Sequence, residues 1–402
     1  MRQPEPAPGG SSAAGPEGEA GEAGEAAPLT REHLLAMARH GGREPLDLSL
    51  GVACDAEPDW FAADGEERSD PGYPKSAGSG ALRAAAAASL RRRFQVSLPD
   101  ESVAVCVGTK EFIASAALFL SREQGGGARH SGTHDSGTRD TVLIPSLCYP
   151  TYAVGAELAG LRTVRVPMGD DLRMRLDRVP AADARRALCL WVNSPANPTG
   201  VVDALDAIAR WGRTHGVLVL SDEAYAEQTW KHRAATILSS GVDGVLAVHS
   251  LSKRSHAPGL RVGFYAGDPR LVRALADRRR DAGLMAATPA QTAAVRLLTE
   301  DHRVTRQRRR TRHRVTSLVE LLNAAGLRCA PPEGGMFVWL KAPGGDGDRF
   351  VRWAARTAGL VLAPGSWYGP AGRPWVRVAA TEEPETVRPR LELLAASPSP
   401  VG

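Results

Sequence analysis

Short apolar runs recur along the chain from residue 103 to residue 266, and longer amphipathic or alanine-rich stretches separate them. Apolar runs of this length bounded by turn residues predict strands, and the stretches between them predict helices. We expect strands at 103–107, 141–144, 163–167, 187–193, 216–221, 244–249 and 262–266. Helices are expected at 81–94, 110–120, 151–160, 202–215 and 268–281. This alternation predicts an α/β fold in which helices cover a seven-stranded, mostly parallel sheet.

A second group of patterns flanks this region. Thr30 suits the N-cap of a helix at 32–39, and residues 46–51 alternate as a short strand that ends in a glycine. We expect the following elements after residue 281: a long arginine-rich helix at 291–325, strands at 335–340 and 374–379, and helices at 347–358 and 383–396. The chain therefore divides into a large domain at 60–280 and a smaller α/β domain that includes 281–396.

Two segments lack large apolar side chains. Residues 1–28 are mostly Pro, Gly, Ala, Ser and Glu, and such a composition cannot bury enough surface to order itself, so we expect a disordered tail. Residues 121–140 are rich in Gly, Ser, Thr, Arg and His. We interpret them as an exposed, mobile insertion within the large domain.

Composition narrows the classes of partner. The chain of 402 residues has a formal charge of only +5, and its basic clusters at 278–280 and 303–314 lie in helical stretches with few aromatic residues. This pattern favours a solvated helix face over nucleic-acid binding. No apolar run approaches ~18 residues, which argues against a membrane span. Residues 1–10 lack the hydrophobic core of a signal peptide. The 5 cysteines are scattered and form no C-x-x-C pair, which indicates reduced thiols in the cytoplasm and no metal site.

Polar residues follow several of the predicted strands where each strand ends. They are Gly108, Asn193, Asp222 and Ser250. Ligands of open α/β sheets bind at the carboxyl ends of the strands, so these positions are candidates for one site. Taken singly, three of these positions have a simpler interpretation. Asp222 could cap a helix, the segment 193–200 could be an ordinary Asn/Pro/Gly turn, and the Gly108 turn could bind nothing.

The most informative stretch surrounds Lys253. Ser250 and Ser252 precede it, and Arg261 follows a glycine turn. Hydroxyls and a guanidinium suit a phosphate, and a primary amine beside them suits an imine to an aldehyde. Of the 50 lysines and arginines, only Lys75, Lys110, Lys231, Lys253 and Lys341 are lysines. Arg cannot replace Lys where a neutral amine is needed, although an isolated lysine is most often an ordinary surface cation.

Four features occur together and in a fixed order. They are Asn197-Pro-Thr-Gly200, Asp222-x-x-Tyr225, Ser250-x-Ser252-Lys253, and an arginine eight positions later at 261. Together they resemble the fold-type-I pyridoxal-phosphate aminotransferases of class I/II, over residues 29 to about 394. The resemblance implies pyridoxal 5′-phosphate as cofactor, and amino acids and oxo acids as small-molecule substrates. It also implies that residues 29–59 join the smaller domain.

The resemblance assigns roles to residues around the cofactor. Lys253 forms the imine and later moves the substrate proton, and Asp222 keeps the pyridine nitrogen protonated. Tyr225 and Asn197 bond the phenolate oxygen of the ring, and Tyr149 stacks on the ring. The residues that match the phosphate-binding group are Thr109, Lys110, Ser250, Ser252 and Arg261.

Three further residues complete the expected site. Arg377 matches the arginine that binds the substrate α-carboxylate through its bidentate fork. Gly51 ends a strand where backbone approaches a ligand closely, so we count it with Asn197 and Arg377 as substrate-binding. Tyr73 matches a tyrosine that reaches the phosphate of the neighbouring subunit, which implies a homodimer.

Longer motifs refine the expected reaction. Segments at 72–78, 149–155, 191–195, 249–254 and 363–372 closely resemble actinobacterial succinyldiaminopimelate transaminases. These enzymes exchange an amino group between glutamate and N-succinyl-2-amino-6-oxopimelate in diaminopimelate and lysine synthesis. The chain departs from them at Thr109 and in the insertion. Alternatives are another class I/II aminotransferase, a carbon–sulfur β-lyase or decarboxylase on the same fold, and a non-catalytic sensor. Lys110 is a candidate contact for a distal substrate carboxylate.

Overall fold

The computed structural model describes residues 29–49, 51, 73–125 and 139–398. The predicted tail at 1–28 and most of the predicted insertion lie outside the described residues. The insertion was expected to begin at Ser121, but the helix α3 continues from Thr109 to Gly125. Its interior carries no Pro and no Gly before Gly125, so nothing in the sequence stops it at residue 120.

The centre of the molecule is a sheet of seven strands in the order β2-β8-β7-β6-β5-β3-β4. The strands are β2 (Val103–Cys106), β3 (Thr141–Pro145), β4 (Arg162–Val166), β5 (Ala187–Asn193), β6 (Leu218–Asp222), β7 (Val245–Ser250) and β8 (Gly263–Gly267). Only β8 runs antiparallel to its neighbours, β7 and β2. The predicted seven-stranded, mostly parallel sheet is therefore confirmed, with strand ends shifted by one or two residues.

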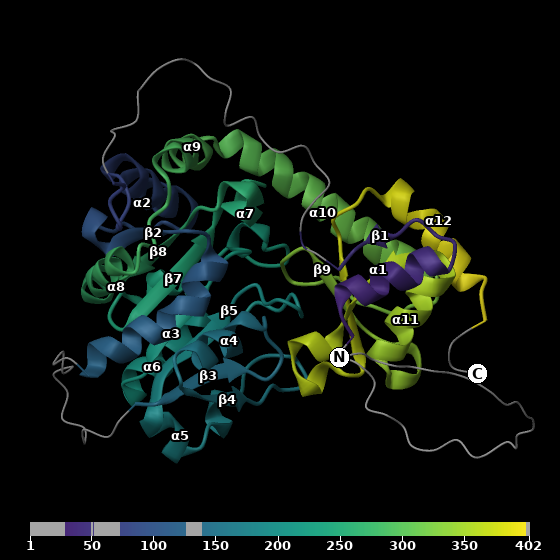
Figure 1. The fold of residues 1–402 in the computed structure, drawn as a ribbon, viewed down its shortest axis with the longest axis horizontal. Coiled ribbons are helices and arrows are strands. Elements are labelled where there is room, and N and C mark those ends of the chain that lie inside the picture. Colours follow the sequence, from purple (N-terminus) through teal and green to yellow (C-terminus); the bar gives the residue numbers. More distant parts are fainter. Residues whose placement is uncertain (1–28, 50, 52–72, 126–138, 399–402) are drawn as a thin grey trace, which may run out of the picture.

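Helices cover both faces of this sheet (Figure 1). The helices α2 (Gly80–Phe94), α6 (Leu205–His215) and α9 (Thr288–Thr299) supply buried residues to one face, against Leu190, Val219 and Ala247. The helices α3, α4 (Thr151–Leu158) and α8 (Pro269–Asp281) cover the other face, against Trp191, Leu220 and Leu246. Adjacent strand residues point to opposite faces, so strands covered on both sides are apolar throughout. A short helix, α5 (Ala181–Arg186), precedes β5.

A second hydrophobic core lies beside the large sheet. It contains a three-stranded antiparallel sheet in the order β11 (Ala363–Pro364), β12 (Trp375–Ala379), β9 (Phe337–Lys341). A two-stranded parallel pair joins β1 (Leu46–Asp47) to β10 (Leu360–Val361). The helices around this core are α1 (Arg31–His40), α10 (Asp301–Ala324), α11 (Gly347–Ala358) and α12 (Pro384–Ala395). The chain thus contains the expected smaller α/β unit. β10 and β11 were not predicted, since two-residue strands leave no period to detect.

The long helix expected at 291–325 is two helices, α9 and α10, separated at Glu300. Arginines from elsewhere in the fold stabilise the break: Arg92 donates to the Leu298 carbonyl at 2.7 Å, and Arg254 donates to the Leu297 carbonyl at 2.8 Å. These bonds satisfy carbonyls that a helix end leaves free. Because their donors come from distant segments, the helical pattern of the sequence did not reveal the break.

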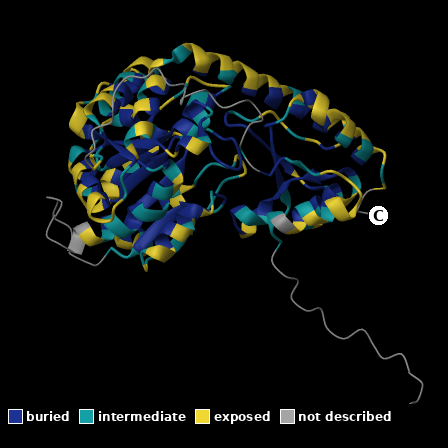
Figure 2. Ribbon diagram, turned by 45° about the horizontal axis from the view of Figure 1, so that its top comes forward, coloured by how far each residue is buried: buried dark blue, intermediate teal, exposed yellow. Residues whose placement is uncertain are grey.

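Buried residues of α9, including Ala293 and Leu297, belong to the core of the large sheet. That core therefore extends past the residue at which we placed the boundary between domains, and the boundary itself stays a prediction. The outer side of α10 is solvent-exposed at Arg303, Arg306 and Arg309, as expected for a solvated helix face (Figure 2).

Candidate active site

A cavity of about 420 Å³ opens at the carboxyl ends of the parallel strands. The Lys253 segment, the loop after β6 and the start of α3 contribute to one side of it, and residues around the second core, including Phe337 and Arg377, contribute to the other. Every predicted site residue except Tyr73 lines it. Those residues are Gly51, Thr109, Lys110, Tyr149, Asn197, Asp222, Tyr225, Ser250, Ser252, Lys253, Arg261 and Arg377. The strand ends, far apart in sequence, therefore meet as the α/β pattern predicted.

Lys253 lies on the short helix α7 (Leu251–Arg254), directly after β7. Its amine donates a hydrogen bond to the Gly51 carbonyl. Burial, followed by the positive charges of Arg377 and Arg261, lowers the pKa of Lys253 from 10.5 to about 8. A sizeable fraction of the amine is therefore neutral near neutral pH, which a nucleophile or general base requires. An ordinary surface lysine would have none of these features.

Asp222 ends β6 and is buried. One carboxylate oxygen accepts from the Ala224 backbone N–H at 3.1 Å, and the other accepts from the Tyr152 hydroxyl at 2.8 Å. Burial raises the pKa of Asp222, while the Tyr152 hydrogen bond, the Ala224 amide and the charge of Lys253 oppose that rise. We did not predict Tyr152 as a site residue. Its only sequence signal is its place as the last residue of Tyr149-Pro-Thr-Tyr152.

Gly108, which directly precedes α3, lies against the guanidinium of Arg261. Gly108 has φ +78°, and a Cβ there would lie 2.4 Å from Nη2 of Arg261. Glycine is therefore required both by its backbone conformation and by the close guanidinium. Free N–H groups at a helix start, together with an arginine and hydroxyls, bind phosphate well. The hydroxyl-bearing residues Thr109, Ser250 and Ser252 line the same cavity.

Arg377, on β12, is the remaining cation deep in the cavity. Its Nη1 donates to Oδ1 of Asn197 at 2.8 Å, and its Nη2 donates to the Ser49 carbonyl. The guanidinium carbon lies 4.0 Å from the Phe337 ring centroid and 5.2 Å from that of Tyr368. Among the described residues, no carboxylate lies within ion-pair distance of Arg377. The other buried arginines each have an acidic partner: Arg254 with Glu227, Arg279 with Glu111, and Arg314 with Glu383.

The aromatic residues of the cavity are held by one another. Tyr225 packs edge-to-face on Phe337 with ring centroids 5.4 Å apart, and burial raises the pKa of its hydroxyl. The Lys110 amine lies 6.0 Å from the Tyr149 ring centroid, at the exposed edge. Trp367 also lines the cavity, and its indole N–H donates to the Leu29 carbonyl at 3.1 Å. Phe337, Trp367 and Tyr368 were not among the predicted site residues, although the sequence 334–337 suggested an edge of the active site.

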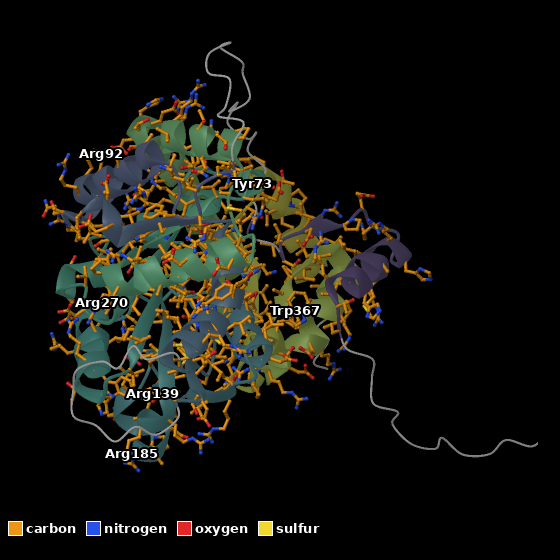
Figure 3. All side chains as sticks on the ribbon, turned by 60° about the vertical axis from the view of Figure 1, so that its left-hand side comes forward. Tyr73, Arg92, Arg139, Arg185, Arg270 and Trp367 are labelled. Atoms are coloured by element: carbon orange, nitrogen blue, oxygen red, sulfur yellow. The ribbon has the colours of Figure 1, made fainter. Side chains whose placement is uncertain are left out.

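Tyr73 does not line the cavity. Its side chain is 94% exposed and lies on the surface of the chain (Figure 3). Within the part of the chain that the structure describes, no three His, Cys, Asp or Glu side chains are grouped to hold a metal ion. No helix there is both long enough and apolar enough to cross a bilayer.

The donor set suits one cofactor. A buried amine of lowered pKa suits an aldehyde, a buried carboxylate suits a ring nitrogen that carries a proton, and a helix start with Arg261 suits a phosphate. These groups meet at the carboxyl edge of a seven-stranded sheet. The fold and the site are therefore those of a fold-type-I pyridoxal-phosphate enzyme.

Comparison with known proteins defines the family. Residues 44–393 match the family described as Aminotransferase class I and II. The chain is 38% identical over 351 residues to the 4-dedimethylamino-4-oxo-anhydrotetracycline transaminase of Streptomyces rimosus, covering 85% of this chain and 90% of that protein. It is also 38% identical over 353 residues to a probable aminotransferase of Mycobacterium tuberculosis, covering 85% and 78%. The chain belongs to the class I and II aminotransferases.

A solved structure agrees. A probable N-succinyldiaminopimelate aminotransferase of Thermus thermophilus superimposes with a TM-score of 0.78 and 27% identity, covering 91% of this chain and 98% of that one. Class I and II aminotransferases use pyridoxal phosphate, so the predicted fold, enzyme class and cofactor are confirmed.

Proposed function

We propose that this aminotransferase exchanges an amino group between glutamate and N-succinyl-2-amino-6-oxopimelate, in the synthesis of diaminopimelate and lysine. Two kinds of observation support this substrate pair. Motifs along the chain resemble succinyldiaminopimelate transaminases, and the name of the Thermus thermophilus neighbour refers to the same substrate. Besides Lys253 and Arg261, the cavity lining contains two further cations, Arg377 and Lys110, and the rings of Tyr149, Trp367 and Tyr368.

We assign the proton transfer to Lys253. When bound, pyridoxal phosphate supplies an electron sink that stabilises negative charge at the substrate Cα. The free amine of Lys253 removes the Cα proton, which its lowered pKa allows. Asp222 holds the ring nitrogen protonated, Tyr225 and Asn197 bond the phenolate oxygen, and Tyr149 packs on the ring.

The phosphate is assigned to the start of α3 and to the residues opposite it. Thr109 and Lys110 contribute backbone N–H groups, Ser250 and Ser252 contribute hydroxyls, and Arg261 contributes the fixed positive charge. The close approach of Arg261 to Gly108 supports this assignment, because it places the guanidinium directly at the helix start.

The single observation that carries the assignment of an α-amino acid substrate is that the Arg377 charge has no acidic partner among the described residues. A buried guanidinium that meets only neutral acceptors in the described residues is costly to keep, and a carboxylate ligand would offset that cost. We therefore assign the substrate α-carboxylate to Arg377, with Asn197 and the Gly51 segment beside it. An arginine placed this way favours substrates that carry a carboxylate next to the reacting carbon.

A distal carboxylate of the substrate is assigned to Lys110. The cavity lining also includes Ile113, Tyr149, Trp367 and Tyr368; the Tyr149 ring lies near Lys110, and the Tyr368 ring lies near Arg377. These side chains would pack against the methylene groups of a long substrate, and the exposed amine of Lys110 would meet its far end. The pairing lies near solvent, so we expect it to tune substrate choice and to contribute little to the reaction itself.

We also propose a cytoplasmic homodimer in which Tyr73 reaches the phosphate of the partner's site. The exposure of Tyr73 supports this, since a tyrosine left 94% exposed has lost the burial that its ring favours. Cys106, Cys148 and Cys189 are free and buried, which suits a reducing compartment. Analytical ultracentrifugation of the holoenzyme and of Tyr73→Phe tests the dimer. A monomer with full activity would contradict it.

The decisive experiment is a screen for the half-reaction that forms pyridoxamine phosphate. Glutamate, N-succinyldiaminopimelate, acetylornithine and aromatic amino acids are offered to the holoenzyme one at a time, and the absorbance of the cofactor is followed. We expect glutamate and N-succinyldiaminopimelate to react fastest. Rapid reaction with acetylornithine or an aromatic amino acid, and none with N-succinyldiaminopimelate, would contradict the proposed substrate.

The remaining arms of the screen separate the alternatives. Pyruvate release from cystathionine without a half-reaction would identify a carbon–sulfur β-lyase, and cofactor binding without turnover of any amine would identify a sensor. The Streptomyces rimosus relative is named for an oxo-anhydrotetracycline. Glutamate as donor together with a polycyclic ketone as acceptor therefore belongs in the screen, and success there alone would place the enzyme with that relative.

A further inference from the structure

Tyr152 and Asp222 form a buried pair beneath the cavity. Tyr152 lies on α4 and Asp222 at the end of β6, and the hydroxyl-to-carboxylate distance is 2.8 Å. Both side chains are buried, at 0% and 4% exposure. The Tyr152 ring stacks on Trp191 with centroids 5.0 Å apart and an interplanar angle of 14°. Since the stacked ring cannot swing away, its hydroxyl is held on the carboxylate.

The direction of the hydrogen bond is fixed by electrostatics. Burial and the adjacent charge of Asp222 raise the pKa of Tyr152 well above its ordinary value, so the phenol keeps its proton and donates. For Asp222, burial alone would favour the neutral acid, and the Tyr152 hydrogen bond is the leading influence in the opposite direction. A charge-assisted hydrogen bond of this kind stabilises the carboxylate form specifically.

We infer that Tyr152 is a positioning residue for the cofactor ring: its hydroxyl holds Asp222 as an oriented carboxylate, so that Asp222 can pair with a protonated ring nitrogen. This inference rests on the proposed role of Asp222. Tyr152 itself is absent from the cavity lining and acts through the carboxylate. Its removal must therefore weaken recognition of the ring nitrogen and leave recognition of the phosphate unchanged.

The chain offers a matched control in Tyr265. This tyrosine is also fully buried and also stacks on an aromatic ring, that of Phe112, at 4.5 Å and 29°. Its hydroxyl has no hydrogen-bond partner in the described part of the chain, and the residue lies outside the cavity lining. Tyr265→Phe thus removes a buried phenolic oxygen, as Tyr152→Phe does, without touching Asp222.

The test compares two ligands that cannot bond covalently to Lys253. One is pyridoxamine phosphate, and the other is its analogue with carbon in place of the ring nitrogen. Dissociation constants are measured for the cofactor-free wild type, Tyr152→Phe, Tyr265→Phe and Asp222→Ala. We expect Tyr152→Phe to weaken pyridoxamine phosphate binding by about tenfold, as loss of a hydrogen bond to a charged group implies, and to leave binding of the carbon analogue unchanged. Tyr265→Phe should change neither.

The outcomes separate two failures. If Tyr152→Phe matches Tyr265→Phe, or weakens both ligands equally, the positioning role is overturned while that of Asp222 stands. If Asp222→Ala weakens both ligands equally, or weakens neither, the proposed role of Asp222 is overturned and the inference falls with it. Thermal unfolding of the cofactor-free proteins checks that Tyr152→Phe still folds. A steady-state measurement adds a second criterion, since kcat should fall while KM for the amino donor stays constant.

Discussion

Two buried arginines of this protein are used in different ways. Arg279, on α8, is fully buried and pairs with Glu111 on α3 at 2.8 Å. Arg377, on β12, is almost as buried, and within the described residues its guanidinium bonds to the Asn197 amide oxygen and the Ser49 carbonyl and lies near two aromatic rings. The first charge is neutralised within the fold, whereas the second, in the described residues, faces the cavity without a counter-ion.

This difference distinguishes an arginine that stabilises the fold from an arginine that can bind a ligand. A buried charge with an internal partner is destabilising to disrupt, because removing one side leaves the other alone in a medium of low dielectric constant. A buried charge that lacks an internal partner keeps its binding capacity for a ligand. The Arg279 pair joins α3, whose first residues line the cavity, to α8 and so supports the site from behind. Arg377 is left to bind whatever anion enters.

The largest expected effect is the loss of turnover in Lys253→Ala, a variant in which both arginines remain in place. Lys253→Ala should lower turnover by about 10⁴-fold, because the Cα proton loses its general base. The variant should still bind cofactor, and both arginines should be unaffected. Stopped-flow absorbance with glutamate measures the reaction, and the same variant allows substrate binding to Arg377 to be titrated without turnover. Near-normal turnover would refute the assignment of Lys253.

Arg279→Met tests the structural half of the comparison. We expect the free energy of unfolding to fall by about 3–5 kcal/mol, since Glu111 would lose its buried partner. KM for glutamate should stay within about twofold at temperatures where the variant is folded. Urea unfolding and steady-state kinetics give the two numbers. A large rise in KM with unchanged stability would reverse the roles we assign to the two arginines.

Arg377→Met tests the functional half. We expect kcat/KM for α-amino acids to fall by about 10²-fold, since the bidentate contact with the carboxylate is lost. Stability should be unchanged or higher, because an unpaired buried charge is removed. Amines that lack an α-carboxylate are the control substrates, and their slow reaction should not slow further. Equal losses for both substrate types would show that Arg377 acts on something other than the carboxylate.

The pH dependence of folding extends the comparison to Lys253. The pKa of Lys253 falls from 10.5 to about 8 on folding, through burial first and then through the charges of Arg377 and Arg261. Between those values the unfolded chain binds more protons, so the stability of the cofactor-free protein rises with pH across this window. Below pH 8 both states are protonated, and the cost of burying the charge is present in full.

The contribution of Lys253 to this slope should approach about 1.4 kcal/mol per pH unit, and Lys253→Met should lack it. In Arg377→Met the window should start at a higher pH, because one nearby positive charge is gone. In Arg279→Met it should not move. Urea unfolding at pH 7 to 10.5 measures all of these. A wild-type slope identical to that of Lys253→Met would contradict the lowered pKa.

The smallest effect concerns the exposed cation. Lys110→Gln should raise KM for a substrate with a distal carboxylate by up to about fivefold, the limit for an exposed ion pair, and should leave alanine unaffected. Lys231→Gln is the matched control, since Lys231 is exposed near Glu333 and outside the cavity lining. An equal effect on both substrates would show that Lys110 does not recognise the distal carboxylate.

The sequence alone predicted the architecture and most of the polar residues that line the cavity. Continuous apolar runs with helices between them predict a mostly parallel sheet that is covered on both faces. The polar residues at the ends of three parallel strands must then meet at one edge of the sheet; they are Asn193, Asp222 and Ser250. The order and spacing of the motifs along the chain then identified Lys253, Asp222 and Arg261 as candidate cofactor-binding residues.

Only the tertiary structure decided which groups support that chemistry. The hydroxyl of Tyr152 reaches Asp222 across 70 positions of the chain, and the partners of Arg377 come from segments as far away as Ser49. The break at Glu300 depends on arginines from α2 and α7. Local pattern cannot encode such contacts, because they depend on where distant backbone segments come to lie. The state of a buried charge follows from its neighbours in space, and those neighbours exist only once the chain has folded.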